Sequence, residues 1–264
     1  MEKAEYIPYR EIVSYLEEIQ TGDIVYVVSD ILELTKVAKE NKERFNVSQF
    51  IEALQEKVGE EGTLLFPTFN WEFCKGKPFD YKKTPGKTGA LGNKALFIND
   101  FKRSKHPIYS FVIWGKHKQE LCQIDSKSSF GQSTIFDFMN QNNAKALVIG
   151  LPSLQGLTFI HYVEKMVGVP YRYDKDFTGL YIDELGNQEE KTYTMYVRDL
   201  VMNPLHINGF EPLSKLIEKQ NLSITKKING IEFHCINLSG IVPVIEKDIL
   251  ENDSKNMYKY NVKK

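Results

Sequence analysis

Three short runs made almost wholly of apolar residues constrain the fold of this chain more than any other feature. They cover residues 24–28, 63–66 and 146–149, and each is followed by Ser, Pro or Gly. A continuous apolar run of this length is typical of a strand that is buried on both faces of a sheet. Between these runs lie helical patterns such as residues 47–58. The alternation predicts an α/β fold with a largely parallel central sheet.

Composition excludes several functional classes. The chain of 264 residues carries 34 Lys and Arg against 35 Asp and Glu, so we expect neither a nucleic-acid partner nor a membrane partner. Its cysteines, Cys74, Cys122 and Cys235, are far apart and lack metal-ligand spacing, which predicts neither a metal site nor a disulfide framework. The start lacks the basic and apolar regions of a signal peptide, and no apolar run approaches about 20 residues. These features predict a cytoplasmic protein.

The sequence pattern changes after residue 176. Residues 179–183 and 192–197 alternate like the two arms of a hairpin around a Leu-Gly-Asn turn, and further helical patterns follow them. No internal repeat or low-complexity linker interrupts the chain. We therefore expect a single domain over residues 1–264, with residues 177–264 as an appended C-terminal subdomain.

A histidine and a glutamate share one predicted helix face directly after the third apolar run. His161 and Glu164 lie three residues apart, with Thr158 near the start of the helix. At this spacing a carboxylate can fix the tautomer of an imidazole and raise its basicity. Such pairs are common on solvated surfaces, but this pair follows the carboxyl end of a strand, where active sites of α/β sheets gather. We therefore interpret it as a general base that removes a proton from a hydroxyl, thiol or amine.

Residues 68–94 predict a long ordered loop over a site. The segment is rich in Gly, Pro, Lys and aromatic residues and has no regular period. Loops of this length in a compact domain are usually functional or disordered. Its aromatic residues, Trp71, Phe73, Phe79 and Tyr81, argue against disorder.

Five motifs in the same order resemble those of the aminoglycoside 3-N-acetyltransferase family, which is distinct from the GNAT acetyltransferases. They are Glu-Gly-Thr-Leu-Leu-Phe-Pro-Thr-Phe at 61–69, Lys-Thr-Pro with Gly-Ala-Leu within 83–91, Arg-Ser-Lys-His-Pro-Ile-Tyr-Ser at 103–110, Trp-Gly-Lys-His at 114–117, and Thr-Phe-Ile-His-Tyr-Val-Glu at 158–164 with Pro-Tyr-Arg at 170–172. No single motif is specific, but the five in order are. The resemblance implies a three-layer α/β/α sandwich that forms one acetyltransferase domain. It also implies acetyl-CoA as the donor and the amine of an amino sugar as the acceptor.

The same resemblance implies roles for individual residues. His161 matches the family's central base, with Glu164 in the same site, and Asp199 is the candidate for an acidic residue that members contribute from a later strand. His106 and Ser110 match a His-Pro-x-x-Ser motif that lines the cleft near the CoA thioester. The chemistry agrees, because an alkylammonium with a pKa near about 10 must lose a proton before its nitrogen can attack a thioester. No covalent enzyme intermediate is required.

Coenzyme A brings phosphate groups, which backbone N–H groups at helix N-termini can hold. Ser29 and Gly89 are candidates for such contacts, and Arg103 and Lys105 are candidates to pair with the phosphates. Thr88 is either a cofactor contact or the cap of the helix that follows it.

The chain departs from the resistance enzymes of the family in three ways. Leu157 stands where those enzymes usually carry Asn, and residues 28–32 lack their His-x-Ser-Leu pattern and the nearby Gly. Drug-binding members tend to have strongly acidic clefts, whereas this chain is nearly neutral and has lysines in the long loop. These lysines are Lys75, Lys77, Lys82 and Lys83.

These departures leave the acceptor open between two classes. A lysine-rich loop fits an anionic acceptor, and segments 159–164 and 193–199 resemble a branch associated with bacterial surface-polysaccharide synthesis. The favoured acceptor is therefore a nucleotide-linked amino sugar, and the alternative is an aminoglycoside antibiotic. A non-catalytic member that binds CoA or a sugar is a further alternative. The sequence does not decide whether the chain forms a homodimer.

Overall fold

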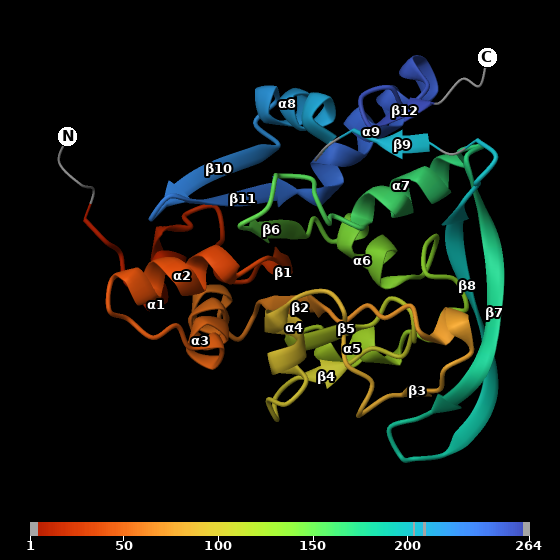
Figure 1. The fold of residues 1–264 in the computed structure, drawn as a ribbon, viewed down its shortest axis with the longest axis horizontal. Coiled ribbons are helices and arrows are strands. Elements are labelled where there is room, and N and C mark those ends of the chain that lie inside the picture. The colour runs from red at the N-terminus through yellow and green to blue at the C-terminus, as the bar shows by residue number, and fades with distance from the viewer. Residues whose placement is uncertain (1–4, 203, 208–209, 261–264) are drawn as a thin grey trace.

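A seven-stranded sheet runs through the middle of the structure (Figure 1). The computed structural model describes residues 5–202, 204–207 and 210–260. The strands of the sheet lie in the order β10-β11-β6-β1-β2-β5-β4. They are β1 (Ile24–Ser29), β2 (Thr63–Pro67), β4 (Lys102–Arg103), β5 (Phe111–Gly115), β6 (Lys145–Ile149), β10 (Ser223–Ile228) and β11 (Ile231–Asn237).

Only the middle of this sheet is parallel. β1 pairs in parallel with β2 and with β6, whereas the pairings that involve β4, β5, β10 and β11 are antiparallel. The expectation of a largely parallel sheet therefore holds for the three central strands and not for the flanks. One cause is the tight turn at Asn229 and Gly230, whose φ angles of 50° and 83° join β10 and β11 as a hairpin.

Helices cover both faces of the sheet. They are α1 (Tyr9–Ile12), α2 (Leu32–Glu40), α3 (Val47–Val58), α4 (Ala90–Ala95), α5 (Lys118–Gln123), α6 (Ile135–Gln141), α7 (Phe159–Val167), α8 (Glu211–Lys219) and α9 (Leu238–Asn252), with 3₁₀ turns η1 (Val13–Tyr15) and η2 (Phe73–Lys75). Side-chain caps start several of them: the Asn46 amide oxygen, for example, accepts from Ser48 N at 3.0 Å at the start of α3.

Alternate residues of the central strands feed two separate hydrophobic cores. In β1, Tyr26 and Val28 belong to the core that includes residues of α5 to α9. Val25 and Val27 belong to the core that includes residues of α1 to α4. Because successive side chains of a strand point to opposite faces, one apolar run fills both cores. The expected three-layer α/β/α sandwich is confirmed.

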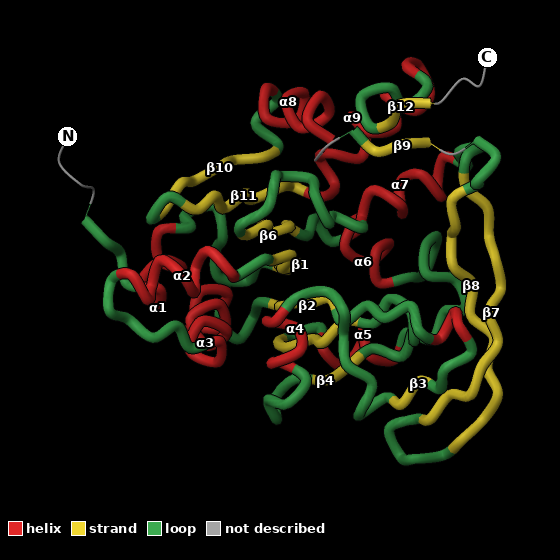
Figure 2. The backbone as a smooth tube through the Cα atoms, viewed as in Figure 1, coloured by secondary structure: helices red, strands yellow, loops and turns green. Residues whose placement is uncertain are grey.

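A long hairpin lies along one end of the sandwich (Figures 1 and 2). Its arms are β7 (Arg172–Ile182) and β8 (Gln188–Arg198), paired over their whole length, with β3 (Phe79–Asp80) beside β7. The hairpin predicted from the alternating pattern is confirmed and is longer than predicted. A separate pair joins β9 (Pro204–His206) to β12 (Tyr258–Tyr260).

The C-terminal part of the chain contributes to the same central sheet. β10 and β11 extend it beyond β6, and α9 contacts α6 and α7. The division of residues 177–264 into a subdomain stays a prediction. No helix among the described residues has the length and apolarity that crossing a membrane requires.

A glycine at the end of β6 fixes how the chain leaves the sheet toward α7. Gly150 has a φ of 68°, and a Cβ atom built there would lie 2.4 Å from the backbone oxygen of Asp30. The adjacent strand ends are joined by a hydrogen bond from Asp30 N to Ile149 O of 2.9 Å. A larger residue would therefore have to push these two strand ends apart.

We expect Gly150→Ala to lower the free energy of unfolding by about 2–4 kcal/mol, because it combines left-handed backbone strain with a steric clash. Gly186→Ala is the control, since Gly186 has a φ of 89° but no heavy atom within 4 Å of the added methyl group. The control should lose about 1 kcal/mol. Urea denaturation measures both, and equal losses would contradict the proposed clash.

Candidate active site

The predicted pair of His161 and Glu164 forms one contact on α7. The helix starts after Thr158, and the His161 Nδ1 lies 2.7 Å from the Glu164 Oε2. The Glu164 side chain is fully buried, whereas 22% of the His161 side chain is exposed. The carboxylate is thus locked in the interior, and the imidazole reaches the surface of the site.

A second pair with the same spacing shows that burial is what distinguishes the first. His117 Nδ1 lies 3.0 Å from Glu120 Oε2, also three residues apart. There, however, the Glu120 side chain is 60% exposed. Water competes with an exposed pair and leaves it little coupling. Sequence reasoning did not single out this second pair, which is a matched reference for the first.

Glu164 is surrounded by partners on both carboxylate oxygens. Arg172 Nε lies 2.7 Å from Oε2, on the same oxygen as His161. The hydroxyl of Tyr171 donates to Oε1 over 3.1 Å, and the hydroxyl of Tyr258 donates to the same oxygen. Burial opposes the charge of Glu164, but His161, Arg172 and the Tyr258 hydroxyl hold the pKa of its carboxyl below the usual value.

The surroundings of His161 keep its imidazole neutral. Burial lowers its pKa below 6.5, Arg172 and Arg198 lower it further, and Glu164 opposes them. An ionised Glu164 can only accept a hydrogen bond, so the proton of a neutral His161 sits on Nδ1. The lone pair is then on Nε2, where the imidazole can act as a base.

An apolar pocket lies beside the start of α7. It has a volume of about 540 Å³, within the usual range for ligand sites, and Phe69, Trp71 and Leu151 form part of its wall. Thr158 also lines it and shares a helix face with His161, three residues on. The buried Tyr26 hydroxyl reaches it and finds no hydrogen-bond partner of normal geometry within the described part of the chain.

Three of the residues predicted to bind the cofactor line this pocket, namely Ser29, Thr88 and Gly89. Gly89 starts α4 with a φ of 97°, and a Cβ there would meet Ser29 O at 3.2 Å. The Thr88 hydroxyl accepts from Phe69 N at 3.0 Å and donates to Pro67 O at 3.1 Å. Thr88 therefore ties the long loop to the end of β2 and makes no cap on α4.

Arg103 lies elsewhere, in the core beneath the long loop. Its guanidinium donates to the Ser110 hydroxyl at 3.0 Å and to backbone oxygens of Thr68, Tyr81 and Thr84. Only 3% of Arg103 is exposed, and burial lowers its pKa to about 10. The expected pairing with CoA phosphates does not fit this placement, because the N–H groups are already donated to the loop. Ser110 is fully buried in the same cluster.

His106 is also a structural residue in this arrangement. Its Nδ1 accepts from the backbone N–H groups of Ile108 and Tyr109, both at 3.2 Å, and its Nε2 lies 3.2 Å from the Ser129 hydroxyl. The proton must then sit on Nε2, pointing at Ser129. Burial lowers the pKa of His106 to about 3, so it stays neutral and holds a turn together. Its ring contacts Tyr109, which contacts Phe130, and Phe130 in turn contacts His161.

Asp199 follows β8 near the site, but its side chain serves its own turn. Its backbone N–H donates to Tyr171 O at 2.8 Å, which places it beside the residues that contact Glu164. Its carboxylate accepts from Val201 N at 2.7 Å. Asp199 is therefore a neighbour of the pair and not a third member of it.

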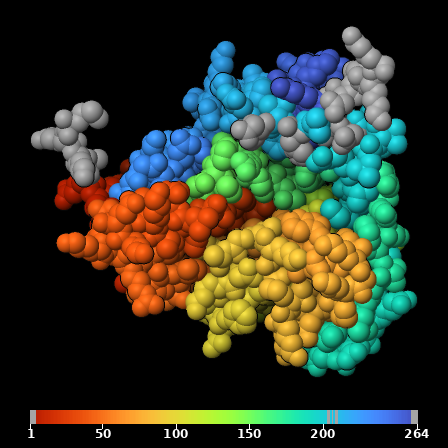
Figure 3. Space-filling model, in the orientation of Figure 1, coloured from red at the N-terminus to blue at the C-terminus, as the bar shows by residue number. Residues whose placement is uncertain are grey.

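The predicted long loop is ordered and runs from β2 to α4 (Figure 2). Its atoms belong to the gold and yellow part of the surface in Figure 3. Phe73 and Phe79 are buried, and Phe73 contacts Tyr193 of the hairpin with ring centroids 6.0 Å apart. Lys75, Lys77 and Lys87 all pair with Glu72. Lys83 pairs with Asp80 at 3.8 Å. Two carboxylates thus face six lysines in residues 68–94, so the loop stays net positive.

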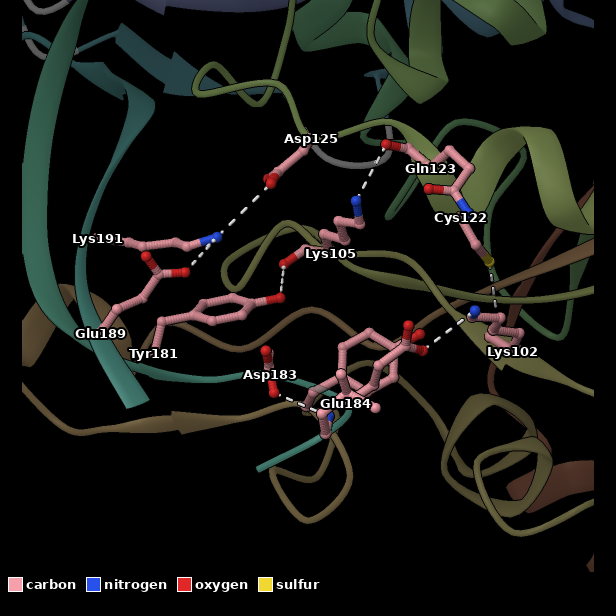
Figure 4. A pocket seen from close by; sticks show the side chains of 12 residues that line it. Lys102, Lys105, Cys122, Gln123, Asp125, Tyr181, Asp183, Glu184, Glu189 and Lys191 are labelled. Atoms are coloured by element: carbon pink, nitrogen blue, oxygen red, sulfur yellow. Dashed lines mark hydrogen bonds and ion pairs between the residues drawn. The ribbon is translucent and has the colours of Figure 1, made fainter. Parts of the chain in front are cut away.

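A second hollow lies beneath the hairpin, away from His161 (Figure 4). It is smaller, about 210 Å³, and its charged side chains pair with one another: Lys191 with Glu189 at 2.9 Å, and Lys102 with Glu184 at 3.1 Å. Lys105 lines it and donates to Gln123 O. Burial raises the pKa of the Cys122 thiol there to about 12, so it is a poor nucleophile. No histidine of the described chain lines this hollow, and its carboxylates Glu184 and Glu189 are paired with lysines.

Sequence reasoning missed the outer partners of the carboxylate. Arg172 and Tyr171 fall in a motif already singled out, so a site role was within reach. Tyr258 is 94 positions beyond Glu164 and carries no local signal. Only the fold brings it to the site.

Comparison with known proteins agrees with this architecture. A family model described as aminoglycoside 3-N-acetyltransferase matches residues 28–249. The chain is 24% identical over 232 residues to the SPbeta prophage-derived aminoglycoside N(3')-acetyltransferase-like protein YokD of Bacillus subtilis (strain 168), covering 79% of this chain and 81% of that one. The crystal structure of YokD superimposes with a TM-score of 0.74, at 21% identity over 93% and 99% of the two chains.

Two further solved structures share the fold at lower identity. AAC-IIIb in a binary complex with CoASH has a TM-score of 0.77 at 15% identity, over 94% of this chain and 98% of that one. Sisomicin-bound AAC-VIa has a TM-score of 0.77 at 16% identity, over 94% and 99%.

We expect Arg103→Met to lower the free energy of unfolding by about 2–4 kcal/mol, because it leaves buried carbonyls without donors. Lys105→Met is the control and should change stability by no more than about 0.5 kcal/mol. Denaturant titration and the Kd for CoA are measured together. Unchanged stability with weakened CoA binding would contradict the structural role and restore the phosphate contact.

Proposed function

Because the chain belongs to the aminoglycoside 3-N-acetyltransferase family, we propose that it transfers the acetyl group of acetyl-CoA to an amine of an aminoglycoside, with His161 as the general base. The family makes it a CoA-dependent N-acetyltransferase whose co-substrate is acetyl-CoA. The observation that carries the proposed mechanism is the 2.7 Å contact between His161 Nδ1 and the buried Glu164.

The first step needs a base that is neutral at working pH. The acceptor arrives as an alkylammonium, which has no lone pair for attack. His161 Nε2 takes one proton from it. The Nδ1–H group stays hydrogen-bonded to the ionised Glu164, whose charge stabilises the imidazolium that forms. The freed amine nitrogen then attacks the thioester carbon.

The second step resolves the tetrahedral intermediate. Its oxyanion needs hydrogen-bond donors. The start of α7 can supply a backbone N–H group, since no side chain of the described residues caps this helix, and the Thr158 hydroxyl lies next to it. Collapse breaks the carbon–sulfur bond, and the nitrogen releases its second proton to solvent, which leaves the neutral amide. The thiolate of CoA takes the proton back from His161, which restores the neutral base.

The apolar pocket fits the pantetheine arm of acetyl-CoA. Its wall of Phe69, Trp71 and Leu151 suits the methylene groups, and the Tyr26 hydroxyl, which lies near Thr158, can bond an amide of the arm. The described residues that line it include no Lys or Arg, so the phosphates lie beyond this pocket or on backbone N–H groups. Ser29 and Gly89 remain the proposed contacts.

The choice of acceptor follows the family and its relatives. AAC-VIa, which shares the fold, is known with sisomicin bound, and the family itself is named for aminoglycosides. The preference for a nucleotide-linked amino sugar rested on lysines in the long loop. Lys75 and Lys77 share Glu72, so ion pairs offset part of that charge, but the loop stays net positive. The choice of an aminoglycoside therefore rests on the family and not on the loop. Asp199 is the proposed contact for a cationic amine, since Glu164 is fully occupied.

The acceptor is tested by thiol release from acetyl-CoA, with product masses determined. Aminoglycosides such as sisomicin should turn over with a kcat in the ordinary enzyme range of about 1–10³ s⁻¹. Turnover confined to nucleotide-linked amino sugars would show that the proposed acceptor is wrong, while the proposed acetyl transfer would still hold. Silence with both classes, together with CoA binding, would favour a non-catalytic binding protein. A cytoplasmic location stays a prediction.

We expect His161→Ala to lower kcat by about 10²–10⁴-fold and to leave the Kd for CoA nearly unchanged, because it removes the base and not the pocket. His117→Ala is the matched control, since it breaks the exposed pair with Glu120 and should keep full activity. Equal activity of the two variants would remove His161 from the mechanism.

The pH dependence follows from the direction of the His161 pKa. A protonated imidazole cannot accept a proton, so kcat falls as the pH drops through that pKa. Because the pKa lies below 6.5, kcat at pH 6.5 should still exceed roughly half of its maximum. A pH–rate profile of kcat with saturating substrates measures this. An acid limb centred above pH 6.5 would contradict the described surroundings of His161.

A further inference from the structure

The buried carboxylate of Glu164 is held by four side chains from three parts of the chain. Oε2 faces His161 Nδ1 and Arg172 Nε, each at 2.7 Å. Oε1 accepts from the hydroxyls of Tyr171 and Tyr258. Arg172 and Tyr171 lie at the start of β7, and Tyr258 lies on β12. Figure 1 shows that α7, the start of β7 and the β9–β12 pair gather at the same corner of the molecule.

Arg172 and Tyr258 also contact each other. An Arg172 terminal nitrogen donates to the Tyr258 hydroxyl over 3.4 Å, and the other donates to Tyr196 O over 3.5 Å. Only 6% of the Arg172 side chain is exposed. Arg172, Tyr258 and Glu164 therefore form a closed triangle of contacts in the interior.

Packing fixes Tyr258 in this triangle. Its ring lies against Tyr171 with centroids 5.1 Å apart and against Phe210 at 5.8 Å. Its strand, β12, pairs with β9 in register, Tyr258 opposite His206. The hydroxyl therefore reaches Glu164 from a paired strand, with its ring packed against two aromatic neighbours.

An isolated carboxylate in this position would not stay ionised. Removing a charge from water costs several kcal/mol by general estimates, and a buried carboxyl escapes that cost by taking a proton. A protonated Glu164 could donate a hydrogen bond to Nδ1 of His161 and move the imidazole proton to Nε2. The imidazole would then have no lone pair facing the acceptor. The guanidinium of Arg172 and the hydroxyls of Tyr171 and Tyr258 oppose the protonation of Glu164.

We propose that Arg172 and Tyr258 are positioning residues for the transfer reaction, which keep Glu164 ionised and aimed at Nδ1 so that Nε2 of His161 carries the free lone pair. The inference rests on the proposed role of His161 as the base. It assigns to the strand β12 a part in catalysis, although only 1% of Tyr258 is exposed.

The test distinguishes a positioning role of these residues from a merely structural one, because it measures the tautomer of His161 directly. ¹⁵N NMR of the full chain, labelled at histidine and measured where the imidazole is neutral, reports which ring nitrogen carries the proton. It needs no acceptor, so it stays informative if the proposed acceptor is wrong. The variants are Arg172→Met, Arg172→Lys and Tyr258→Phe. Tyr196→Phe is the control, because its hydroxyl donates to Val169 O and not to Glu164.

Wild type and Tyr196→Phe should carry the proton on Nδ1. Arg172→Met should move a large part of it to Nε2 and lower kcat by more than about tenfold, short of the roughly 10⁴-fold that follows loss of the orienting carboxylate in a protease triad. Its KM for acetyl-CoA should stay nearly constant. Arg172→Lys should recover part of the Nδ1 proton and part of kcat, because it restores the positive charge. Tyr258→Phe should shift the tautomer in the same direction, by less.

An Nδ1 proton retained in folded Arg172→Met, with kcat unchanged, would overturn the proposal for Arg172. If Arg172→Met does not fold, Tyr258→Phe decides, since it removes one oxygen atom and no packing. Tyr258→Phe indistinguishable from Tyr196→Phe in tautomer and in kcat would overturn the proposal for Tyr258. Loss of kcat in all variants with no change of tautomer would indicate a merely structural role and would equally overturn it.

Discussion

The ionised, buried carboxylate of Glu164 is the constraint on which the rest of the site depends. A charge in the interior is stable only with partners in good geometry, and these come from α7, β7 and β12. Its partners therefore tie together elements that are distant in the sequence. The exposed pair of His117 and Glu120 has the same spacing and none of this support. Burial, and not the spacing of the two residues, makes His161 a candidate base.

The fold serves this contact by bringing strand ends together. β6 leaves the sheet at Gly150, where the left-handed backbone lets the chain pass Asp30 and enter α7. The apolar pocket opens beside the same helix start, between the ends of β1 and β2 and the entry to α4. The long loop closes one wall of it and is fixed from below by Arg103. The apolar pocket and the pair of His161 and Glu164 thus lie at one edge of the sheet, where sites of α/β proteins gather.

Sequence patterns predicted the elements and contacts that depend on residues near one another in the chain. They missed those that depend on packing between distant segments. The central strands, α3, the hairpin and the pair on α7 follow from apolar runs, periodicity and spacing. β10 and β11 were missed although the Asn229-Gly230 turn signals a hairpin. Arg103 and His106 match motifs of the family, yet the structure engages both in holding loops, because a motif does not reveal whether a side chain points into a cleft or into the core. Tyr258 has no local signal, since its role arises from β12 pairing with β9.

A crystal structure with CoA and an acceptor that the protein turns over would test the central claim most directly. The claim predicts the reacting amine nitrogen within hydrogen-bond reach of His161 Nε2, about 2.6–3.2 Å, and the pantetheine arm along Trp71 and Thr158. An acceptor amine bound away from His161, or a CoA arm in the hollow beside Lys102 and Lys191, would contradict it.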